Sequence, residues 1–402
     1  MITRTRPLLV LLVLTLGLVV GCAAPKPAEP PVTPSPTLGA APQLPGPTRT
    51  QPAPTAVPPT ATAAPSPTSA PKAPVPVRVF CAGSLMIPFA ALEPAFEAAN
   101  PDLDMQMEAH GSIQVIRHVT DIHEEIDVVA SADHALLSML MYNTLNPDTG
   151  QPYAAWNIRF ATNRVVVAYD PASPGANEIT TENWAEIVSR PRTRVGLSDP
   201  RFDALGYRQL MILQLAEPLY GRKTLFEDVL MGRFARPIRA EAVGDGTVIH
   251  VPELLDPRPG GTIVLRGASI QLIPLLQSGD VDYLFEYESV AEQHGLRYVA
   301  LPDALNLGDP AHDADYRQVT VQLDFRRFAS VEPVFRGETI AYGLTIPANA
   351  PQPEAATRWV AFLLGTEGRR IMAENDHPLL DPLRADHWDR LPEPLKLLCT
   401  PE

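Results

Sequence analysis

The stretch VRVFCAGSLMIPFAALEPAFEAANPDLDMQMEAHGSIQVIRHVT, residues 77–120, contains one pattern twice. A run with β-strand character ends at a Gly-Ser pair, first Gly83-Ser84 and then Gly111-Ser112, and apolar residues at helical spacing follow each pair. The next buried run, IDVVAS, covers residues 126–131. This β-α-β-α-β order favours a parallel sheet with right-handed crossovers.

Each Gly-Ser pair also has the composition of an anion site. The first N–H groups of a helix have no partner within the helix, and the helix dipole places partial positive charge at the same end. Glycine lets a ligand approach the backbone closely, and serine adds a hydroxyl donor. The alternative is that Ser84 and Ser112 only cap their helices, since serine is a favoured N-cap residue.

The N-terminal region predicts export. Arg4 and Arg6 precede the apolar run LLVLLVLTLGLVV, and residues 19–22, VVGC, resemble the cleavage motif of bacterial lipoproteins. We therefore expect residues 1–21 to be a signal peptide and Cys22 to be the lipid-modified N-terminus, with an uncleaved anchor as the alternative. Residues 22–76 are rich in Pro, Ala and Thr and predict a disordered tether.

The charge balance and the cysteines limit the partners of the remaining chain. The formal net charge of the 402 residues is −14, which argues against a nucleic-acid partner. Neutral N–H and O–H dipoles can still bind an anion without a basic field.

Apart from Cys22, the cysteines are Cys81 and Cys399, without metal-ligand spacing. Export would permit a disulfide between them, although two free thiols are the favoured alternative.

A second series of α/β units predicts a second lobe. Strand-like and helix-like runs alternate in the order RVVVAY (164–169), TRVGLSD (193–199), GYRQLMILQLAEPLYG (206–221), TIVLRG (262–267), SIQLIPLLQSG (269–279) and VDYLFEY (281–287). A strand, ETIAYGLTIP (338–347), and one long helix, residues 354–375, follow. We expect residues 77–164 and 342–402 to form one lobe and 165–341 the other. Two crossing strands would join them, with a ligand cleft between.

Several strings together resemble the tungstate/molybdate-binding proteins of ABC importers, of the WtpA type. The strings run in the same order from Val77 to about Asp381: AGSL, DVVASAD, FATNRVVVAY, NWAEIVSRP, RVGLSDPRFDALGYR, LQSGDVDYLFEYESVAEQHG and YGLTIP. The resemblance implies an α/β type II periplasmic-binding-protein fold.

The resemblance also implies a set of ligand contacts. In this sequence they fall on Gly83, Ser84, Ser112, Phe202, Asp203, Ala204, Ser269 and Tyr287. The serines and Tyr287 would donate hydrogen bonds to oxyanion oxygens. Asp203 would be a possible ligand to the tungsten or molybdenum atom of the bound oxyanion, unless it only caps a helix. The family's second carboxylate falls on Ser269, so expansion of the metal's coordination is in question here, with Glu286 or Glu288 as an alternative source of that carboxylate.

Other residues with metal-binding side chains have a simpler interpretation. His118 and His123 are five positions apart, which does not align two ligands on one helix face, so we expect a solvated helix end. We expect His312, Asp313 and Asp315 to keep a turn-rich loop soluble. The sequence has no nucleophile elbow, P-loop or two-histidine metal motif.

These observations predict a non-enzymatic protein that needs no cofactor. It would be a lipid-anchored monomer on the outer side of the cytoplasmic membrane, and it would pass tungstate or molybdate to the permease of an ABC importer. One alternative keeps the fold and binds sulfate or phosphate, with Asp203 accepting a proton from hydrogen phosphate. Another is an exported hydrolase with Ser84 or Ser112 as nucleophile, which would require a positioned base.

Overall fold

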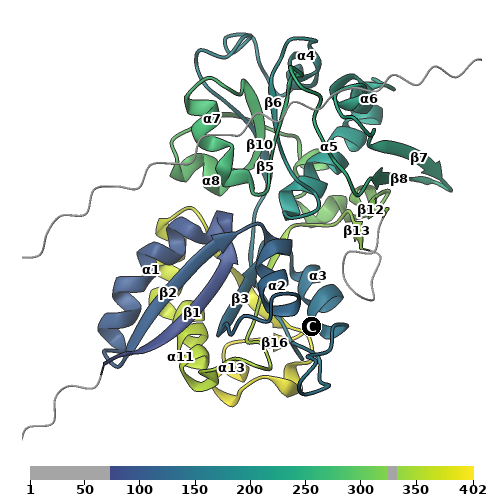
Figure 1. The fold of residues 1–402 in the computed structure, drawn as a ribbon. Coiled ribbons are helices and arrows are strands. Elements are labelled where there is room, and N and C mark those ends of the chain that lie inside the picture. The colour runs from purple at the N-terminus through teal and green to yellow at the C-terminus, as the bar shows by residue number, and fades with distance from the viewer. Residues whose placement is uncertain (1–72, 325–332) are drawn as a thin grey trace, which may run out of the picture. The chain divides into compact units, whose positions relative to one another are not determined.

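The computed structural model of the chain describes residues 73–324 and 333–402 (Figure 1). The predicted signal peptide, Cys22 and most of the predicted tether lie outside these residues. Strand β1 begins at Val75, two positions before the predicted start of the globular part. None of the helices in the described part of the chain is long and apolar enough to cross a membrane.

Lobe 1 is built on a seven-stranded sheet. In spatial order its strands are β16 (Thr400–Pro401), β15 (Leu379–Ala385), β4 (Ile158–Thr162), β14 (Ala341–Thr345), β3 (Val128–Ser131), β1 (Val75–Ala82) and β2 (Leu103–His110). Strand β1 pairs in parallel with β2 and β3, as the β-α-β-α-β pattern predicts. Strand β14 is antiparallel to both of its neighbours, so the complete sheet is mixed.

The helices of lobe 1 cover this sheet. They are η1 (Gly83–Leu85), α1 (Met86–Ala99), α2 (Ser112–Thr120), α3 (His134–Leu136), η2 (Leu137–Tyr142), α11 (Pro353–Leu364), α12 (Thr366–Glu374), η5 (Trp388–Arg390) and α13 (Glu393–Lys396). Buried residues of α1 and α2 follow the apolar spacing of the sequence: Pro88, Phe89, Leu92, Phe96, Ile113, Val115, Ile116 and Val119.

Lobe 2 contains two smaller sheets. The five-stranded sheet has the order β11 (Arg297–Ala300), β5 (Val165–Tyr169), β10 (Tyr283–Tyr287), β6 (Val195–Ser198) and β9 (Ile263–Arg266). The four-stranded sheet has the order β13 (Val334–Arg336), β12 (Val319–Leu323), β8 (Gly246–Val251) and β7 (Arg239–Val243).

Helix α5 (Ala204–Tyr220) contacts strands of both lobe 2 sheets. Twelve of its residues are buried, and its hydrophobic residues surround the helix rather than forming one stripe. The other helices of lobe 2 are α4 (Trp184–Ser189), α6 (Leu225–Leu230), η3 (Ser269–Gln271), α7 (Ile273–Gln277), α8 (Glu288–Gln293), α9 (Asp303–Asn306), η4 (Pro310–His312) and α10 (Asp313–Tyr316).

The chain passes between the lobes twice. Strand β4 of lobe 1 ends at Thr162 and β5 of lobe 2 begins at Val165, while β13 and β14 are separated by residues 337–340. The predicted lobe limits at 164/165 and 341/342 remain predictions, although the sheets change at these places. The α/β class with two lobes and two crossings is confirmed.

One sequence prediction differs from the structure, and one sheet of the structure was not predicted. The single helix expected over residues 354–375 is two helices, α11 and α12, which break at Gly365. Gly365 has extended backbone (φ −77°, ψ −177°), and this lets α12 turn to contact α1 and β15. The four-stranded sheet was not predicted because β7 has no buried residue, so no apolar alternation marks it.

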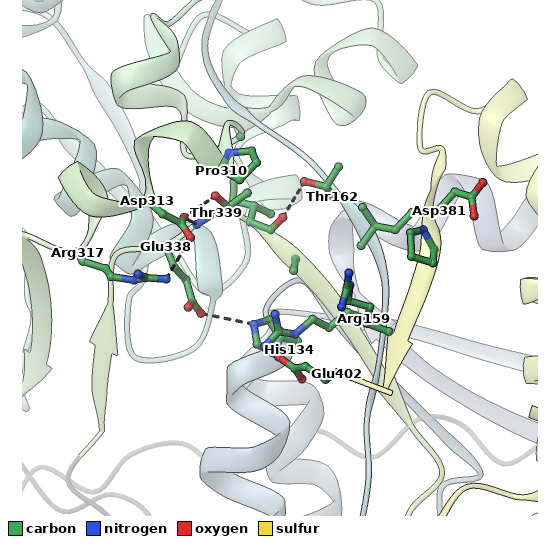
Figure 2. A pocket seen from close by; sticks show the side chains of 16 residues that line it. His134, Arg159, Thr162, Pro310, Asp313, Arg317, Glu338, Thr339, Asp381 and Glu402 are labelled. Atoms are coloured by element: carbon green, nitrogen blue, oxygen red, sulfur yellow. Dashed lines mark hydrogen bonds and ion pairs between the residues drawn. The ribbon is translucent and has the colours of Figure 1, made fainter. Parts of the chain in front are cut away.

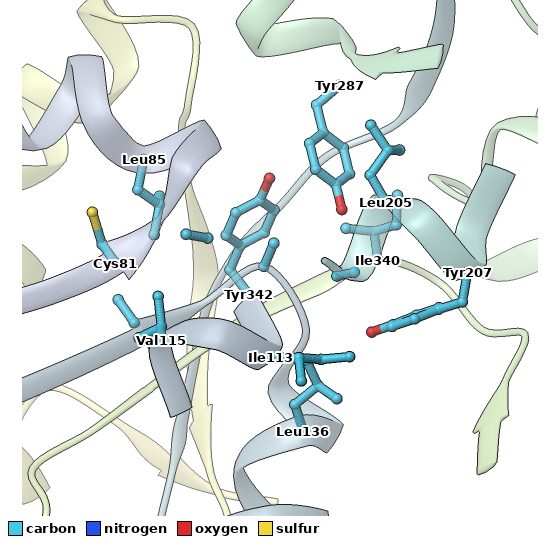
Figure 3. Packing of buried hydrophobic residues seen from close by; sticks show 14 of the residues in the cluster. Cys81, Leu85, Ile113, Val115, Leu136, Leu205, Tyr207, Tyr287, Ile340 and Tyr342 are labelled. Atoms are coloured by element: carbon cyan, nitrogen blue, oxygen red, sulfur yellow. The ribbon is translucent and has the colours of Figure 1, made fainter. Parts of the chain in front are cut away.

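Both cysteines of the described chain are free and buried, so no disulfide joins Cys81 and Cys399. Burial raises the pKa of Cys81, and burial also raises the pKa of Cys399, to about 11. The hydrophobic core includes aromatic residues from both lobes, among them Tyr207, Tyr287 and Tyr342 (Figure 3).

Candidate functional site

The first Gly-Ser pair lies where β1 ends and η1 begins. Ser84 is 4% exposed, and its Oγ lies 2.8 Å from Oη of Tyr342 on β14. The two hydroxyls share one hydrogen bond, so one of the two hydrogens remains available to another acceptor. Gly83 faces lobe 2, because a Cβ built there would lie 3.0 Å from the side chain of Ile270.

The second Gly-Ser pair starts α2 and contacts lobe 2 directly. The N–H groups of Ile113 and Gln114 donate to the carbonyl oxygen of Phe202, at 3.0 and 3.2 Å. The free N–H groups of this helix terminus thus bind a carbonyl of the other lobe. The Oγ of Ser112 accepts from the N–H of Ala132 at 3.0 Å, which leaves the Ser112 hydrogen free to donate.

Gly111 is required for this approach of the two lobes. A Cβ at this position would lie 2.5 Å from the carbonyl oxygen of Phe202 and 2.8 Å from that of Gly267. Its φ is −64°, so its backbone conformation is open to other residues. The absence of a side chain at Gly111 therefore serves contact between lobes.

Asp203 caps α5 and is surrounded by donors. Its Oδ2 accepts from the Ser198 hydroxyl at 2.7 Å and from the Ser269 N–H at 2.8 Å. Its Oδ1 accepts from the N–H of Leu205 at 3.4 Å. Burial raises the pKa of Asp203. Ala204 is the buried first residue of α5. Asp203 thus acts as the N-cap of α5 in this structure, and metal ligation by this carboxylate remains a prediction.

Tyr287, at the end of β10, receives a hydrogen bond from a buried guanidinium. Nη1 of Arg208 on α5 donates to the Tyr287 Oη at 2.6 Å and to the carbonyl of Ala132 in lobe 1 at 2.8 Å. Nη2 of Arg208 lies 3.5 Å from Oδ2 of Asp133. Within the described residues the Tyr287 hydrogen has no acceptor, so it is free to donate.

Tyr342 connects this region to the first crossing between the lobes. The side-chain amide of Asn163 donates to the Tyr342 Oη at 3.2 Å and to the Ser289 hydroxyl at 2.8 Å. Ser289 in turn lies 3.1 Å from Nδ1 of His377. Burial raises the pKa values of Tyr287 and Tyr342, so both remain protonated donors at neutral pH.

These side chains form one buried group between the lobes, which we call the interlobe cluster. Each member is 5% exposed or less, and the members are Ser84, Ser112, Asp203, Arg208, Ser269, Glu286, Tyr287 and Tyr342. The Ser269 hydroxyl donates to Oε1 of Glu286 at 3.0 Å. The cluster offers three spare hydroxyl hydrogens and one guanidinium, which suits a ligand that carries only acceptor oxygens.

Sequence reasoning left Arg208 and Tyr342 out of the site, and it named Glu286 only as an alternative to Ser269 for the second carboxylate. All three lie within the strings that carry the family resemblance. A usable signal existed for Arg208, which is the single cation in the largely apolar run ALGYRQLMILQLA of a mostly buried helix. Because a buried arginine needs acceptors, its position already implied a partner such as a carboxylate or an anion.

A separate cavity of about 590 Å³ lies beside the two crossings (Figure 2). Its lining contains three arginines and four carboxylates, and several of them pair: His134 Nε2 with Glu338 at 3.5 Å, and Arg317 with Asp313 at 3.1 Å. Arg159 pairs with Glu402 at 2.5 Å. These ion pairs leave no excess of positive charge for an anion, so the interlobe cluster is the better candidate site.

The metal-like groupings of the described residues are also accounted for by protein contacts. Asp133, His134 and Glu338 come within 4.8 Å of one another, but Oδ2 of Asp133 already accepts from Tyr207 and faces Arg208. His118 bonds to Glu124 at 2.9 Å and its ring stacks on His110.

Other polar residues near the predicted metal-like patches also have protein partners. His123 bonds to Tyr153 at 2.6 Å. Asp313 accepts from the N–H of Thr339 at 2.8 Å, so it holds the loop before β14. Residues 121–123 at the end of α2 are exposed, as expected, whereas the His118 side chain is only 15% exposed.

The chain is similar to known solute-binding proteins. It is 36% identical over 325 residues to the molybdate/tungstate-binding protein WtpA of Thermococcus kodakarensis, covering 79% of this chain and 85% of that protein. It is 35% identical over 319 residues to a solute-binding protein of Petrotoga mobilis described as uncharacterized, covering 79% and 88%. A solved structure with a match is the periplasmic molybdate-binding protein of Azotobacter vinelandii, with a TM-score of 0.48, 13% identity and coverage of 76% and 99%.

The model of one protein family, described as bacterial extracellular solute-binding protein, matches residues 77–375. This range holds every member of the interlobe cluster and ends within the loop that follows α12. With a match of this length, and with curated relatives above 30% identity over most of their length, the chain belongs to the bacterial extracellular solute-binding protein family.

Proposed function

We propose that this protein captures tungstate or molybdate between its two lobes. The observation that carries the proposal is the interlobe cluster, where Ser84, Ser112, Tyr287 and Tyr342 provide hydroxyls next to the buried guanidinium of Arg208. A tetrahedral dianion presents only acceptor oxygens, and such donors replace its hydration shell. The name of the WtpA relative supports the choice of anion.

The arrangement gives no support to hydrolysis. Over residues 73–324 and 333–402, neither Ser84 nor Ser112 has a histidine among its hydrogen-bond partners. A serine nucleophile needs an adjacent base that accepts its proton. We therefore propose a binding protein without catalytic activity.

Calorimetric titration of the purified chain tests the ligand. We expect heat of binding with tungstate and molybdate and weaker binding with sulfate and phosphate. A ligand at 100 times its Kd stabilises the folded state by about 2.7 kcal/mol, so the melting temperature should rise in parallel. A melting temperature that none of the four anions changes would contradict an oxyanion-binding function.

We also propose that Cys22 anchors the protein on the outer side of the cytoplasmic membrane, where it delivers the anion to an ABC permease as a monomer. Support comes from VVGC at residues 19–22 and from the Pro-rich composition of the segment that follows. Cys22→Ala should release the protein or leave the precursor uncleaved. Membrane attachment unaffected by this change, with an unmodified wild-type N-terminus, would contradict the anchor.

A further inference from the structure

Glu286 has a carboxyl group whose two oxygen atoms are in different situations. The side chain is fully buried on β10, directly before Tyr287. Its Oε1 accepts from the Ser269 hydroxyl at 3.0 Å and from the Tyr287 N–H at 2.9 Å. Its Oε2 is buried and has no hydrogen-bond partner among the described residues. An unpaired buried carboxyl oxygen is costly, so a partner for it is expected.

Asp203 differs from Glu286 in this respect, although both contact Ser269. Both oxygens of Asp203 accept hydrogen bonds from lobe 2 donors. Ser269 holds the two carboxyls together, because its N–H donates to Asp203 and its hydroxyl donates to Glu286. The spare oxygen of this pair therefore belongs to Glu286.

The surroundings of Glu286 favour its neutral form. Burial, with a further contribution from the charge of Asp203, raises the pKa of Glu286 to about 8. The other titratable groups nearby are Tyr287 and Tyr342, which remain neutral, and Arg208, which binds Tyr287. A neutral carboxylic acid has one O–H donor, whereas an ionised carboxylate would repel an entering dianion.

We propose that Glu286 contacts the bound oxyanion as a carboxylic acid, donating the hydrogen on Oε2 to an anion oxygen while Ser269 and the Tyr287 amide hold Oε1. This inference rests on the proposed function, since it requires an oxyanion between the lobes. It also gives a basis for selectivity. A site made of donors favours anions without a proton, such as tungstate, molybdate and sulfate, over hydrogen phosphate, whose own proton needs an acceptor.

The test is calorimetric titration of sodium tungstate into the full chain between pH 6 and pH 9. For the wild type we expect a constant Kd up to the pKa of Glu286 and a Kd that rises about tenfold per pH unit above it. Glu286→Gln retains a neutral N–H donor, so its Kd should be about two- to tenfold weaker at pH 7 and should not change up to pH 9. Glu286→Ala loses a hydrogen bond to a charged oxygen and should bind about ten- to a hundredfold more weakly.

Glu288→Gln is the matched control, because Glu288 is two positions away and pairs with Arg164 outside the interlobe cluster. Its tungstate affinity and pH profile should equal those of the wild type. If Glu286→Gln binds as weakly as Glu286→Ala at pH 7, a neutral donor at this position contributes nothing to binding and the inference is wrong. A Glu286→Gln variant that keeps the wild-type pH profile would also contradict it. If Glu286→Ala does not fold, the profile of Glu286→Gln decides alone. A wild type that binds no oxyanion contradicts the proposed function itself.

Discussion

Lobe 1 and lobe 2 contribute different chemistry to the interlobe cluster. Lobe 1 supplies neutral hydroxyls, from Ser84, Ser112 and Tyr342. Lobe 2 supplies the ionisable side chains of Asp203, Arg208 and Glu286, with Tyr287 beside them. The neutral donors can bind any oxyanion, so discrimination between anions and dependence on pH should arise from lobe 2.

The largest expected effect comes from the one guanidinium of the cluster. Arg208→Met leaves the carboxylate of Asp133 without its cation and removes the bonds to Ala132 and Tyr287. Breaking a buried ion pair on one side costs about 3 to 5 kcal/mol. We expect the free energy of unfolding, measured with urea, to fall by this amount and anion binding to become undetectable.

Arg317→Met is the control for this change. The Arg317 side chain is 55% exposed, and its ion pair with Asp313 lies outside the cluster. An exposed pair contributes about 0 to 1 kcal/mol, so stability and binding should stay close to those of the wild type. Equal losses in the two variants would show that the buried guanidinium of Arg208 has no special role.

The pH dependence of stability should differ between a buried base in lobe 1 and a buried acid in lobe 2. Burial lowers the pKa of His377 to about 4. The stability that depends on a neutral His377 is complete above pH 6.5, which is its pKa in the unfolded chain. It is lost as the pH falls toward 4, by about 1.4 kcal/mol per pH unit and about 3 kcal/mol in all. The raised pKa of Glu286 acts oppositely, so stability is lost as the pH rises from about 4.5 to about 8.

Urea unfolding of the ligand-free protein at several pH values measures both contributions. His377→Gln should reduce the loss of stability between pH 6.5 and pH 4 and leave the alkaline side unchanged. Glu286→Gln should flatten the profile between about pH 4.5 and pH 8. If both variants keep the wild-type profile, neither buried group titrates as we expect.

The two serines of lobe 1 should be separable by stability and affinity. Ser112→Ala leaves the buried N–H of Ala132 without its acceptor, so unfolding free energy and affinity should both fall. Ser84→Ala removes a hydroxyl whose partner, Tyr342, keeps a second donor in Asn163, so mainly affinity should fall. Each loss of a hydrogen bond to a charged oxygen is about 1.5 to 3 kcal/mol, or roughly ten- to a hundredfold in Kd. Calorimetry and urea unfolding of the same preparations check this, and wild-type affinity in both variants would place the ligand elsewhere.

The sequence was sufficient for the architecture because apolar periodicity and the order of strands are local features. It predicted the parallel pairing of β1 with β2 and β3, and it predicted both crossings. It did not predict the sheet of β7, β8, β12 and β13, since β7 has no buried residue and leaves no buried pattern. The break at Gly365 was also missed, because helical spacing continues on both sides of it.

The site was harder to predict than the fold because its roles depend on contacts between distant residues. Ser84 and Tyr342, 258 positions apart, form one hydrogen bond. Ser269 departs from the family pattern in sequence, and the structure places its hydroxyl on Glu286. No local pattern indicates that Ser269 holds two carboxyls together. The binding roles of the eight residues predicted from the resemblance stay predictions.

The smallest expected effect concerns how closely the lobes approach each other. Gly111→Ala places a Cβ 2.5 Å from the Phe202 carbonyl oxygen, a backbone atom of the other lobe that cannot rotate away. Such overpacking costs about 1 to 3 kcal/mol, and only the conformation with contacting lobes bears this cost. Tungstate affinity should therefore fall about five- to a hundredfold, while the unfolding of lobe 1 should change little.

Gly267→Ala is the matched control on the opposite side of the same contact, because its Cβ would meet only the Gln271 side chain, at 3.9 Å. Small-angle scattering at saturating tungstate should give a larger radius of gyration for Gly111→Ala than for Gly267→Ala. Equal affinities and equal radii of gyration for the two variants would contradict a role for Gly111 in lobe contact. In that case the N–H donors of α2 would bind the anion while Phe202 is not in contact with them.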